Sequence, residues 1–344
     1  MKSRFFGSLG ILALLPALCV GQATKSWTAP LTRDGQPDLQ GVWLSHAVTP
    51  LERPKELEGR ASVTDAEVAE LKKRGERLFH GGENDYTTAD NALAVALSNP
   101  TTYSNPNKST GGAFDNMIEL EFDHRTSLIV DPPNGRIPPM TPAGKRRQAE
   151  ALLRAVAQPP PAGPEELSNF QRCITFGVPR LGGNFGAGPY SYYQIMQTPG
   201  YVIVFMELIH DARVIPLDGR PHLPSSVRTW NGDSRGRWEG QTLVVDTTNF
   251  SAESSFLGAA ENLHLVERFT RVAADEVDYE ITADDPTTWT KPWTAMVRLR
   301  SSPEKIYEYA CHEGNSISVT SILAAARAQE KAADKAAETG KPAK

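Results

Sequence analysis

The sequence predicts a mainly β protein, in which antiparallel strands form a barrel or a strongly curved sheet and an irregular N-terminal lobe carries two short helices. From about Tyr190 onward, short runs of alternating apolar and polar residues are separated by turn residues, which is the pattern of an antiparallel sheet. The 26 Pro and 27 Gly in the chain favour many short loops over a helical bundle.

The first 23 residues have the three parts of a secretory signal peptide. Lys2 and Arg4 give a basic start, an apolar run spans residues 7–20, and small residues follow at Gly21 and Ala23. The apolar run is shorter than the ~20 residues that a membrane-spanning helix needs. We therefore expect residues 1–23 to be removed on export, leaving a periplasmic or extracellular protein.

The net charge indicates which kinds of molecule the protein is expected not to bind. Loss of Lys2 and Arg4 with the signal peptide moves the formal charge from −5 to −7. A mildly acidic surface argues against binding to nucleic acid, and no later run predicts insertion into a membrane after signal cleavage. The Gly-rich run at 181–188 neither follows a strand nor opens a helix, so we expect no phosphate-binding loop and no cofactor.

Residues 24–184 are predicted to form the irregular lobe, packed on the barrel. Thr64 and Glu67 have the spacing of a capping box, which predicts a helix from there to about Leu78. The Asn-, Gly-, Ser- and Thr-rich residues 80–115 predict a long loop, and whether it closes as a lid is left open.

A short strand over 127–130 and a second helix complete the lobe. This helix begins near Thr141 and ends before Pro159.

The β unit is predicted over residues 185–315, followed at 316–344 by a solvated helix that ends in a disordered tail. Thr198–Gly200 has the composition of a hairpin turn between two strands. The predicted strands share period-two alternation and cover Tyr190–Gln197, Tyr201–Leu208, Ala212–Ile215, Thr242–Thr247, Leu263–Val272, Glu276–Thr282, Thr294–Leu299 and Ile306–Cys311. By contrast, Asp233–Gly236 is interpreted as a hairpin turn.

Two cysteines remain after signal cleavage, Cys173 and Cys311. A distant pair in an oxidising compartment predicts a structural disulfide, since an exported free thiol tends to oxidise.

Candidate chemistry is concentrated in residues 207–224. If the strand from Tyr201 continued straight, His210 would lie on its apolar face, with Asp211 and Arg213 opposite; a turn near His210–Asp211 is the alternative. In the functional interpretation His210 is a general acid/base, Arg213 holds an anionic group of a ligand, and His222 and Asp211 lie at the pocket mouth. In the structural interpretation the same residues close a turn.

Two further ionisable residues interrupt apolar faces of predicted strands. Glu267 alternates with Leu265 and Phe269, and His312 follows a similar alternation near the end of the sheet. A carboxylate on an apolar face either pairs with a cation or has a raised pKa, as in proton-transfer sites. Glu267 and His312 are therefore catalytic candidates beside His210, and an interior ion pair of Glu267 with Arg213 or Arg271 is the alternative.

Aromatic residues supply the remaining ligand-binding candidates. Trp293 and Tyr309 fall within the β unit, where such side chains either line a cavity for a planar ligand or pack the core. The run from Trp230 to Trp238 is interpreted as a structural latch. Histidines occur without the spacing of a metal motif, so we expect no metal site.

Five runs of the sequence carry a resemblance: Ile209–Arg213, Leu217–Pro224, Asp233–Gly240, Asp285–Trp289 and Tyr309–Asn315. In these runs the chain resembles a group of exported bacterial proteins without an established activity, which implies export and a β fold. Gly41-Val-Trp43 is similar to the Gly-x-Trp opening of lipocalin-type barrels.

Taken together, these features predict an exported β-barrel protein that binds a small organic molecule, apolar or aromatic, in a cavity with polar anchors. One alternative is an acid/base enzyme, a lyase, isomerase or hydrolase, that uses His210 and Glu267 in that cavity. Another is a structural or assembly protein of the cell envelope.

Overall fold

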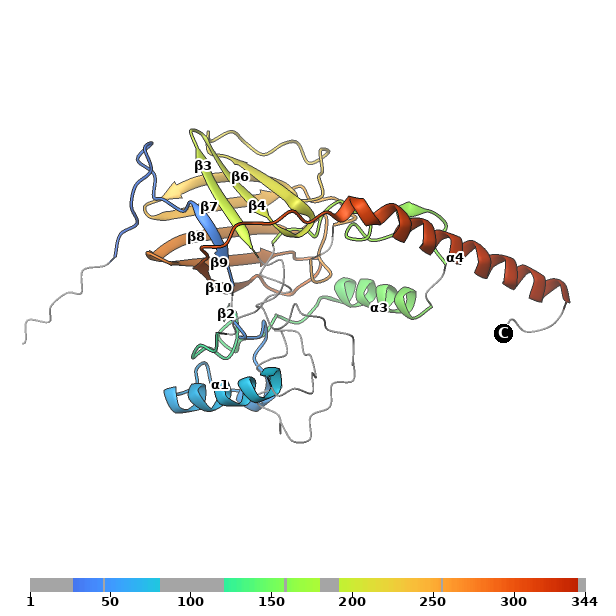
Figure 1. The fold of residues 1–344 in the computed structure, drawn as a ribbon, viewed down its shortest axis with the longest axis horizontal. Coiled ribbons are helices and arrows are strands. Elements are labelled where there is room, and N and C mark those ends of the chain that lie inside the picture. The colour runs from blue at the N-terminus through green and yellow to red at the C-terminus, as the bar shows by residue number, and fades with distance from the viewer. Residues whose placement is uncertain are drawn as a thin grey trace, which may run out of the picture.

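The computed structural model describes residues 27–45, 47–80, 121–157, 160–179, 192–254 and 256–339. The expected signal peptide, nearly all of the loop at 80–115, the Gly-rich run at 181–188 and the end of the tail lie outside the described residues. Within them the chain is mainly β, and the sheet curls into an antiparallel, nearly closed barrel (Figure 1), which confirms the predicted fold class.

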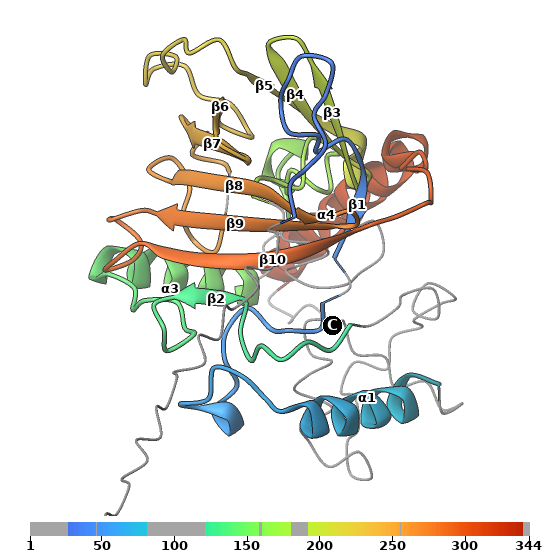
Figure 2. The ribbon, with the colours of Figure 1, turned by 90° about the vertical axis from the view of Figure 1, so that its left-hand side faces the viewer.

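Nine strands follow one another around the barrel in the order β5-β4-β3-β1-β10-β9-β8-β7-β6, and all neighbours in this order pair antiparallel. A further short strand, β2 (Ile129–Asp131), pairs with one end of β10 (Figure 2). The nine strands are β1 (Gly41–Leu44), β3 (Tyr193–Thr198), β4 (Tyr201–Met206), β5 (Asp211–Pro216), β6 (Asp233–Glu239), β7 (Thr242–Thr248), β8 (His264–Ala273), β9 (Glu276–Asp284) and β10 (Trp293–Ser301).

Period-two alternation explains most of these strands. Along β9 every second side chain is buried, from Val277 to Ala283, because successive residues of a strand point to opposite faces. The β3–β4 hairpin turns at Pro199-Gly200, as its composition predicts, and Gly200 adopts a φ of 80° there.

Two predictions about the β unit at residues 185–315 are wrong. Asp233–Gly236 is part of strand β6 and not a turn; the turn comes later, at Gly240, where φ is 61°. Ile306–Cys311 is not a strand, because both edges of β10 are already paired, and the chain instead enters helix α4 at Cys311.

Strand β1 shows why the lobe and the barrel are not separable in this protein. It comes from the segment expected to be irregular, yet it lies between β3 and β10. Trp43 on β1 is almost fully buried, and its indole N–H donates to the carbonyl of Leu39 at 2.9 Å. Burying this indole supports the strand although only four residues pair.

The barrel is open only between β5 and β6, whose backbones do not pair. Eight antiparallel steps separate these two strands, so they run in the same direction, and residues 217–232 must return along the barrel to join them. Side chains close the gap: a Cβ on Gly236 of β6 would lie 2.8 Å from Ile215 and 2.6 Å from Leu217.

Side chains fill the barrel interior. Large residues that are fully buried come from strands all around it and from loops at both ends, and they form one continuous core. The largest of them are Trp43, Trp289, Trp293, Phe250, Leu39, Leu128, Ile195, Ile215, Leu243, Leu265 and Ile281. Within the described residues, apolar side chains thus occupy the centre of the barrel.

The described α-helices lie outside the barrel: α1 (Asp65–His80), α3 (Pro142–Ala157) and α4 (Cys311–Thr339), of which α4 extends well beyond it (Figure 1). Thr64 and Glu67 form the predicted capping box at the start of α1. Short 3-10 helices cover Lys55–Leu57, Pro164–Glu166 and Leu208–His210. Within the described residues, none of the helices has the length and apolar character that spanning a bilayer requires.

A small second core packs α1 against the preceding loop. Its members are apolar residues from before, within and after α1: Val48, Leu57, Val63, Val68, Leu71 and Phe122.

Candidate functional site

The segment after β4 is a tight turn, which confirms the turn alternative. Ile209 and His210 have φ values of 65° and 59°, so the chain reverses into β5. His210 is exposed, lies edge-on to Phe205 with ring centroids 4.7 Å apart, and its Nδ1 accepts a hydrogen bond from the Tyr309 backbone N–H at 3.4 Å. The histidine therefore joins the turn to the segment that leads into α4.

Asp211 connects two loops at this end of the barrel. Its Oδ2 accepts hydrogen bonds from the Thr175 hydroxyl and the Asn231 amide, both at 2.7 Å. Thr175 belongs to a segment that crosses the barrel end, and Asn231 lies just before β6. Asp211 thus fixes these loops in place.

Arg213 and Glu267 form an ion pair inside the barrel, which is the alternative expected for Glu267. Arg213 Nη1 donates to Glu267 Oε1 at 3.0 Å and Nη2 contacts Oε2, while the Tyr279 hydroxyl donates to Oε1 at 2.5 Å. Arg213 also donates to Ser234 and Thr247, each at 3.0 Å. Each of the three guanidinium nitrogens therefore has at least one hydrogen-bond partner.

The electrostatics of this group follow from its burial. Burial alone lowers the pKa of Arg213, but the charge and hydrogen bonds of Glu267 more than offset it, so the net shift is upward. Burial, together with the nearby charge of Glu267, raises the pKa of Tyr279 well above its ordinary value. The second expected partner, Arg271, instead lies over the Trp43 ring at 5.3 Å.

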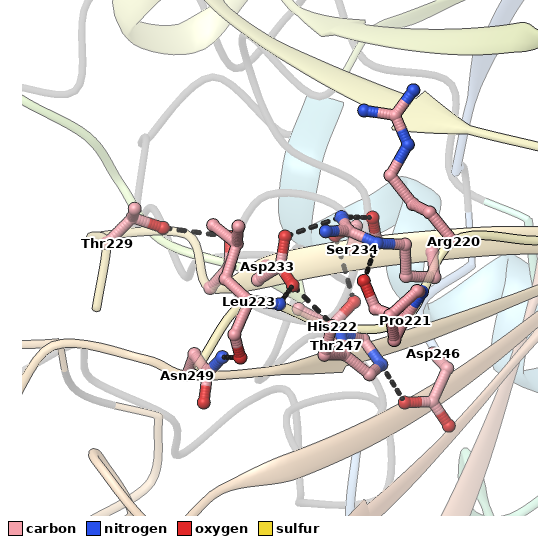
Figure 3. Close-up of polar contacts among 12 residues, drawn as sticks. Arg220, Pro221, His222, Leu223, Thr229, Asp233, Ser234, Asp246, Thr247 and Asn249 are labelled. Atoms are coloured by element: carbon pink, nitrogen blue, oxygen red, sulfur yellow. Dashed lines mark hydrogen bonds and ion pairs between the residues drawn. The ribbon is translucent and has the colours of Figure 1, made fainter. Parts of the chain in front are cut away.

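His222 pins the connection between β5 and β6 onto the outer face of the sheet. Its Nδ1 lies 3.0 Å from Asp233 and its Nε2 lies 2.9 Å from Asp246 (Figure 3). The backbone N–H of Leu223 donates to the same Asp233 carboxylate at 2.8 Å. Since both ring nitrogens face carboxylate oxygens, His222 holds residues 217–232 in place and leaves neither nitrogen for a ligand.

Asp246 is shared with a second histidine. His264 Nε2 lies 2.9 Å from its other oxygen, and this hydrogen bond raises the pKa of His264 and lowers that of Asp246. Neither residue was selected from the sequence, because outward-facing polar positions on regular strands look like ordinary solvated residues.

The two cysteines form the predicted disulfide. Cys173 and Cys311 have Cα atoms 5.9 Å apart, and the bond ties the segment across the barrel end to the first residue of α4. His312 is exposed in the first turn of that helix. Trp293 is fully buried, stacks on Phe256 with centroids 5.9 Å apart and meets Trp289 edge-on at 5.5 Å, so it packs the core.

The structure does not bring His210, Glu267 and His312 into one cavity. Glu267 has an exposed fraction of 0%, whereas both histidines are exposed. The acid/base pair of the enzyme alternative is thus divided between a buried carboxylate inside the barrel and an exposed histidine on a turn at its end. In the part of the chain that the structure describes, no group of three or more His, Cys, Asp or Glu side chains is placed to hold a metal ion.

A cavity lies instead at the end of the barrel where β6 and β8 begin. We call it the mouth cavity; its volume is about 240 Å³. Two irregular segments, 168–178 and 250–263, line it together with Trp230. Its aromatic lining residues are Phe170, Phe176, Trp230, Phe250 and Phe256, and its polar lining residues are Ser168, Asn169, Thr175, Glu253 and Ser254.

Several contacts hold the rim of the mouth cavity. The disulfide at Cys173 lies between the two rim phenylalanines in sequence, and Asp211 holds Thr175. On the other side, the Ser254 hydroxyl donates to the Trp230 carbonyl at 2.6 Å. The aromatic walls are therefore tied to the barrel from both sides.

None of the catalytic or ligand-binding candidates selected from the sequence lines the mouth cavity within the described segments. Phe170, Phe176 and Glu253 lie in irregular chain, where neither period two nor period 3.6 identifies a face. The sequence offered one indication of this cavity: Phe170 and Phe176 lie on either side of Cys173, and the predicted disulfide at Cys173 holds that segment in place. Trp230, interpreted as part of a latch, is the one cavity residue that the sequence had marked.

Comparisons with known proteins add little to this geometry. No family model matches the chain, and no curated protein matches it significantly. Among solved structures, it is similar to a single-residue mutant of the fluorescent protein UnaG, with 12% identity over 40% of this chain and 87% of that chain and a TM-score of 0.22. The barrel assignment accordingly depends on the strand pairing of this chain.

Proposed function

We propose that this is an exported protein that binds a small apolar or aromatic molecule in the mouth cavity. The observation that carries the proposal is the set of five aromatic side chains around one open volume of about 240 Å³. Concave, mostly apolar sites with a few polar groups are the usual form of small-molecule sites in proteins.

The volume limits the size of the ligand. An apolar cavity of about 150 Å³ is large enough to take up benzene. The mouth cavity is larger than this, so it fits a ligand of one or two fused rings and excludes large polycyclic molecules. Because the barrel interior is packed, the ligand lies at the end of the barrel and not along its axis.

Aromatic walls favour a planar ligand. Offset or edge-on ring pairs contribute about 0.5–1.5 kcal/mol beyond the area they bury. The hydroxyl oxygens of Thr175 and Ser254 and the side-chain oxygen of Asn169 offer hydrogen-bond acceptors at the edge of the cavity, while the two hydroxyl protons are donated to Asp211 and to the Trp230 carbonyl.

Export is supported by the disulfide between Cys173 and Cys311. Disulfides of this kind persist in oxidising compartments such as the periplasm and are rare in the cytosol.

The test is a titration with indole, followed by ligand-observed NMR. We expect saturable binding to the native protein and at least a tenfold loss in Ala260→Phe, because Ala260 lines the cavity and a phenyl ring there fills it. Ala252→Phe is the matched control, since Ala252 is exposed on the same loop and does not line the cavity. Equal binding by both variants, or none by the native protein, would overturn the proposal.

A further inference from the structure

The mouth cavity is lined mainly by apolar residues, and it also carries a negative charge. Among the described residues that line it, Glu253 is the one with a charged side chain. Five aromatic residues and one acidic residue thus line the same volume, and no described Lys, Arg or His lines it.

We propose that the mouth cavity selects an organic cation, namely an alkylated ammonium group on a small apolar or aromatic body. This inference rests on the proposed function and names its ligand class. The faces of aromatic rings carry negative electrostatic potential and attract cations, most strongly when the cation is weakly hydrated. Alkylation of an ammonium group lowers its hydration, and the Glu253 carboxylate complements its charge.

The protein itself already places a cation beside this pair of groups. The guanidinium carbon of Arg172 lies 6.0 Å from the centroid of the Trp230 ring, and its Nη1 lies 3.8 Å from Glu253 Oε2. Arg172 does not line the mouth cavity, so its guanidinium leaves that volume open. The indole and the carboxylate therefore attract positive charge in this structure without a ligand.

The contact between Arg172 and Glu253 is weak enough for a ligand to replace. The two atoms are 3.8 Å apart, which is beyond hydrogen-bond distance, and the Glu253 side chain is 63% exposed. Solvent-exposed ion pairs of this kind contribute little net stability. A cation inside the cavity can thus share or take over the carboxylate at little cost, and Arg172 acts as its internal competitor.

The same geometry disfavours anions. A carboxylate or phosphate ligand would meet Glu253 with no described cationic side chain lining the cavity to neutralise it. At the rim, the Asn169 amide donates to the backbone carbonyl of Glu253 at 3.4 Å, and the Thr175 hydroxyl donates to the Asp211 carboxylate at 2.7 Å. We therefore expect the charge of a ligand to affect its affinity for the mouth cavity more than its shape does.

The experiment compares two probes of the same shape and different charge. Benzyltrimethylammonium and neopentylbenzene differ by a nitrogen cation in place of a neutral carbon, and their dissociation constants are measured by quenching of tryptophan fluorescence. We expect the native protein to bind the cation at least tenfold more tightly than the neutral probe, and phenylacetate more weakly than either.

Two variants attribute this preference to Glu253. In Glu253→Gln the ratio of the two affinities is expected to fall to within about threefold of one, whereas Glu261→Gln, an exposed carboxylate on the same loop that does not line the cavity, keeps the native ratio. Arg172→Gln is expected to tighten binding of the cation by a few fold, because the internal competitor is gone.

The possible results distinguish the proposed preference for a cation from the proposed binding of aromatic molecules. If the neutral probe binds as tightly as the cation, or phenylacetate binds best, the cation preference is wrong and the ring-binding function stands. If no probe binds, both are wrong. A preference for the cation that survives in Glu253→Gln would also overturn the role given to the carboxylate.

Discussion

Arg213 on β5 reaches across the barrel to Glu267 on β8, and the two form an ion pair sealed from solvent. Their side chains are 8% and 0% exposed, and Ser234, Thr247 and Tyr279 complete the hydrogen bonding. Because β5 borders the gap in the barrel, this pair connects one edge strand, from the inside, to the third strand on the other side of the gap.

Removing one partner of this pair is expected to destabilise the protein strongly. Glu267→Leu leaves the guanidinium of Arg213 buried without its counter-charge, and such losses cost roughly 3–5 kcal/mol. The measurement is the free energy of unfolding from urea denaturation. In the double variant Arg213→Met/Glu267→Leu most of the loss should be recovered, because apolar pairs replace buried ion pairs well. A double variant as unstable as the sum of the single ones contradicts this account.

The unpaired gap between β5 and β6 gives a second prediction. In Gly236→Val the added side chain overlaps Ile215 and Leu217, which close the gap, and overpacking of this kind costs about 1–3 kcal/mol in unfolding free energy. Gly314→Ala is the control, since a Cβ there meets nothing within 4 Å and a helix prefers alanine. Equal melting temperatures for Gly236→Val and the native protein would show that the gap is loosely packed.

A strand could be predicted from the sequence where burial of one face gives it an alternating pattern, and could not where its pairing partners determine its position. The strands with clear alternation, such as Glu276–Asp284, were predicted to within two residues, because one face of each is buried. Strand β1 has four residues and β6 contains Arg235, Gly236 and Arg237, so neither has an apolar rhythm to detect. The position of β1 is set by β3 and β10, which are distant in the sequence, and that of β6 by its hairpin with β7.

The site was harder to predict for the same reason. Glu267 and Arg213 were correctly singled out as unusual, and burial explains why: an interior charge requires a partner, and each supplies it to the other. The mouth cavity is formed by irregular segments whose positions depend on one disulfide and on the hydrogen bonds of Asp211. Local patterns do not encode such long-range contacts.

The contact between His264 and Asp246 predicts a pH dependence. The hydrogen bond raises the pKa of His264, so its contribution to stability is complete below the ordinary value of 6.5 and is lost as pH rises through the raised value. The pKa of Asp246 is lowered, so its contribution is present above the ordinary 3.8 and is lost as pH falls through the lowered value. The contact should therefore be strongest between these two values.

A double-mutant cycle measures this contact without other titrating groups. The coupling energy between His264→Gln and Asp246→Asn, obtained from unfolding free energies, should be largest near pH 5 and decline by pH 9. It should stay below about 1 kcal/mol, because both side chains are partly exposed to solvent. A coupling that does not change with pH would contradict the protonation of His264 as its source.

The disulfide between Cys173 and Cys311 should contribute both to stability and to the rim of the mouth cavity. It closes a loop of 138 residues, so Cys173→Ser/Cys311→Ser is expected to lower the free energy of unfolding by roughly 2–5 kcal/mol. The segment bearing Phe170 and Phe176 loses its tie to α4, and binding of indole should weaken several-fold. Reductant should bring the native protein to the same values and leave the variant unchanged. If reduction alters stability but not indole affinity, the Asp211 hydrogen bonds alone hold the rim.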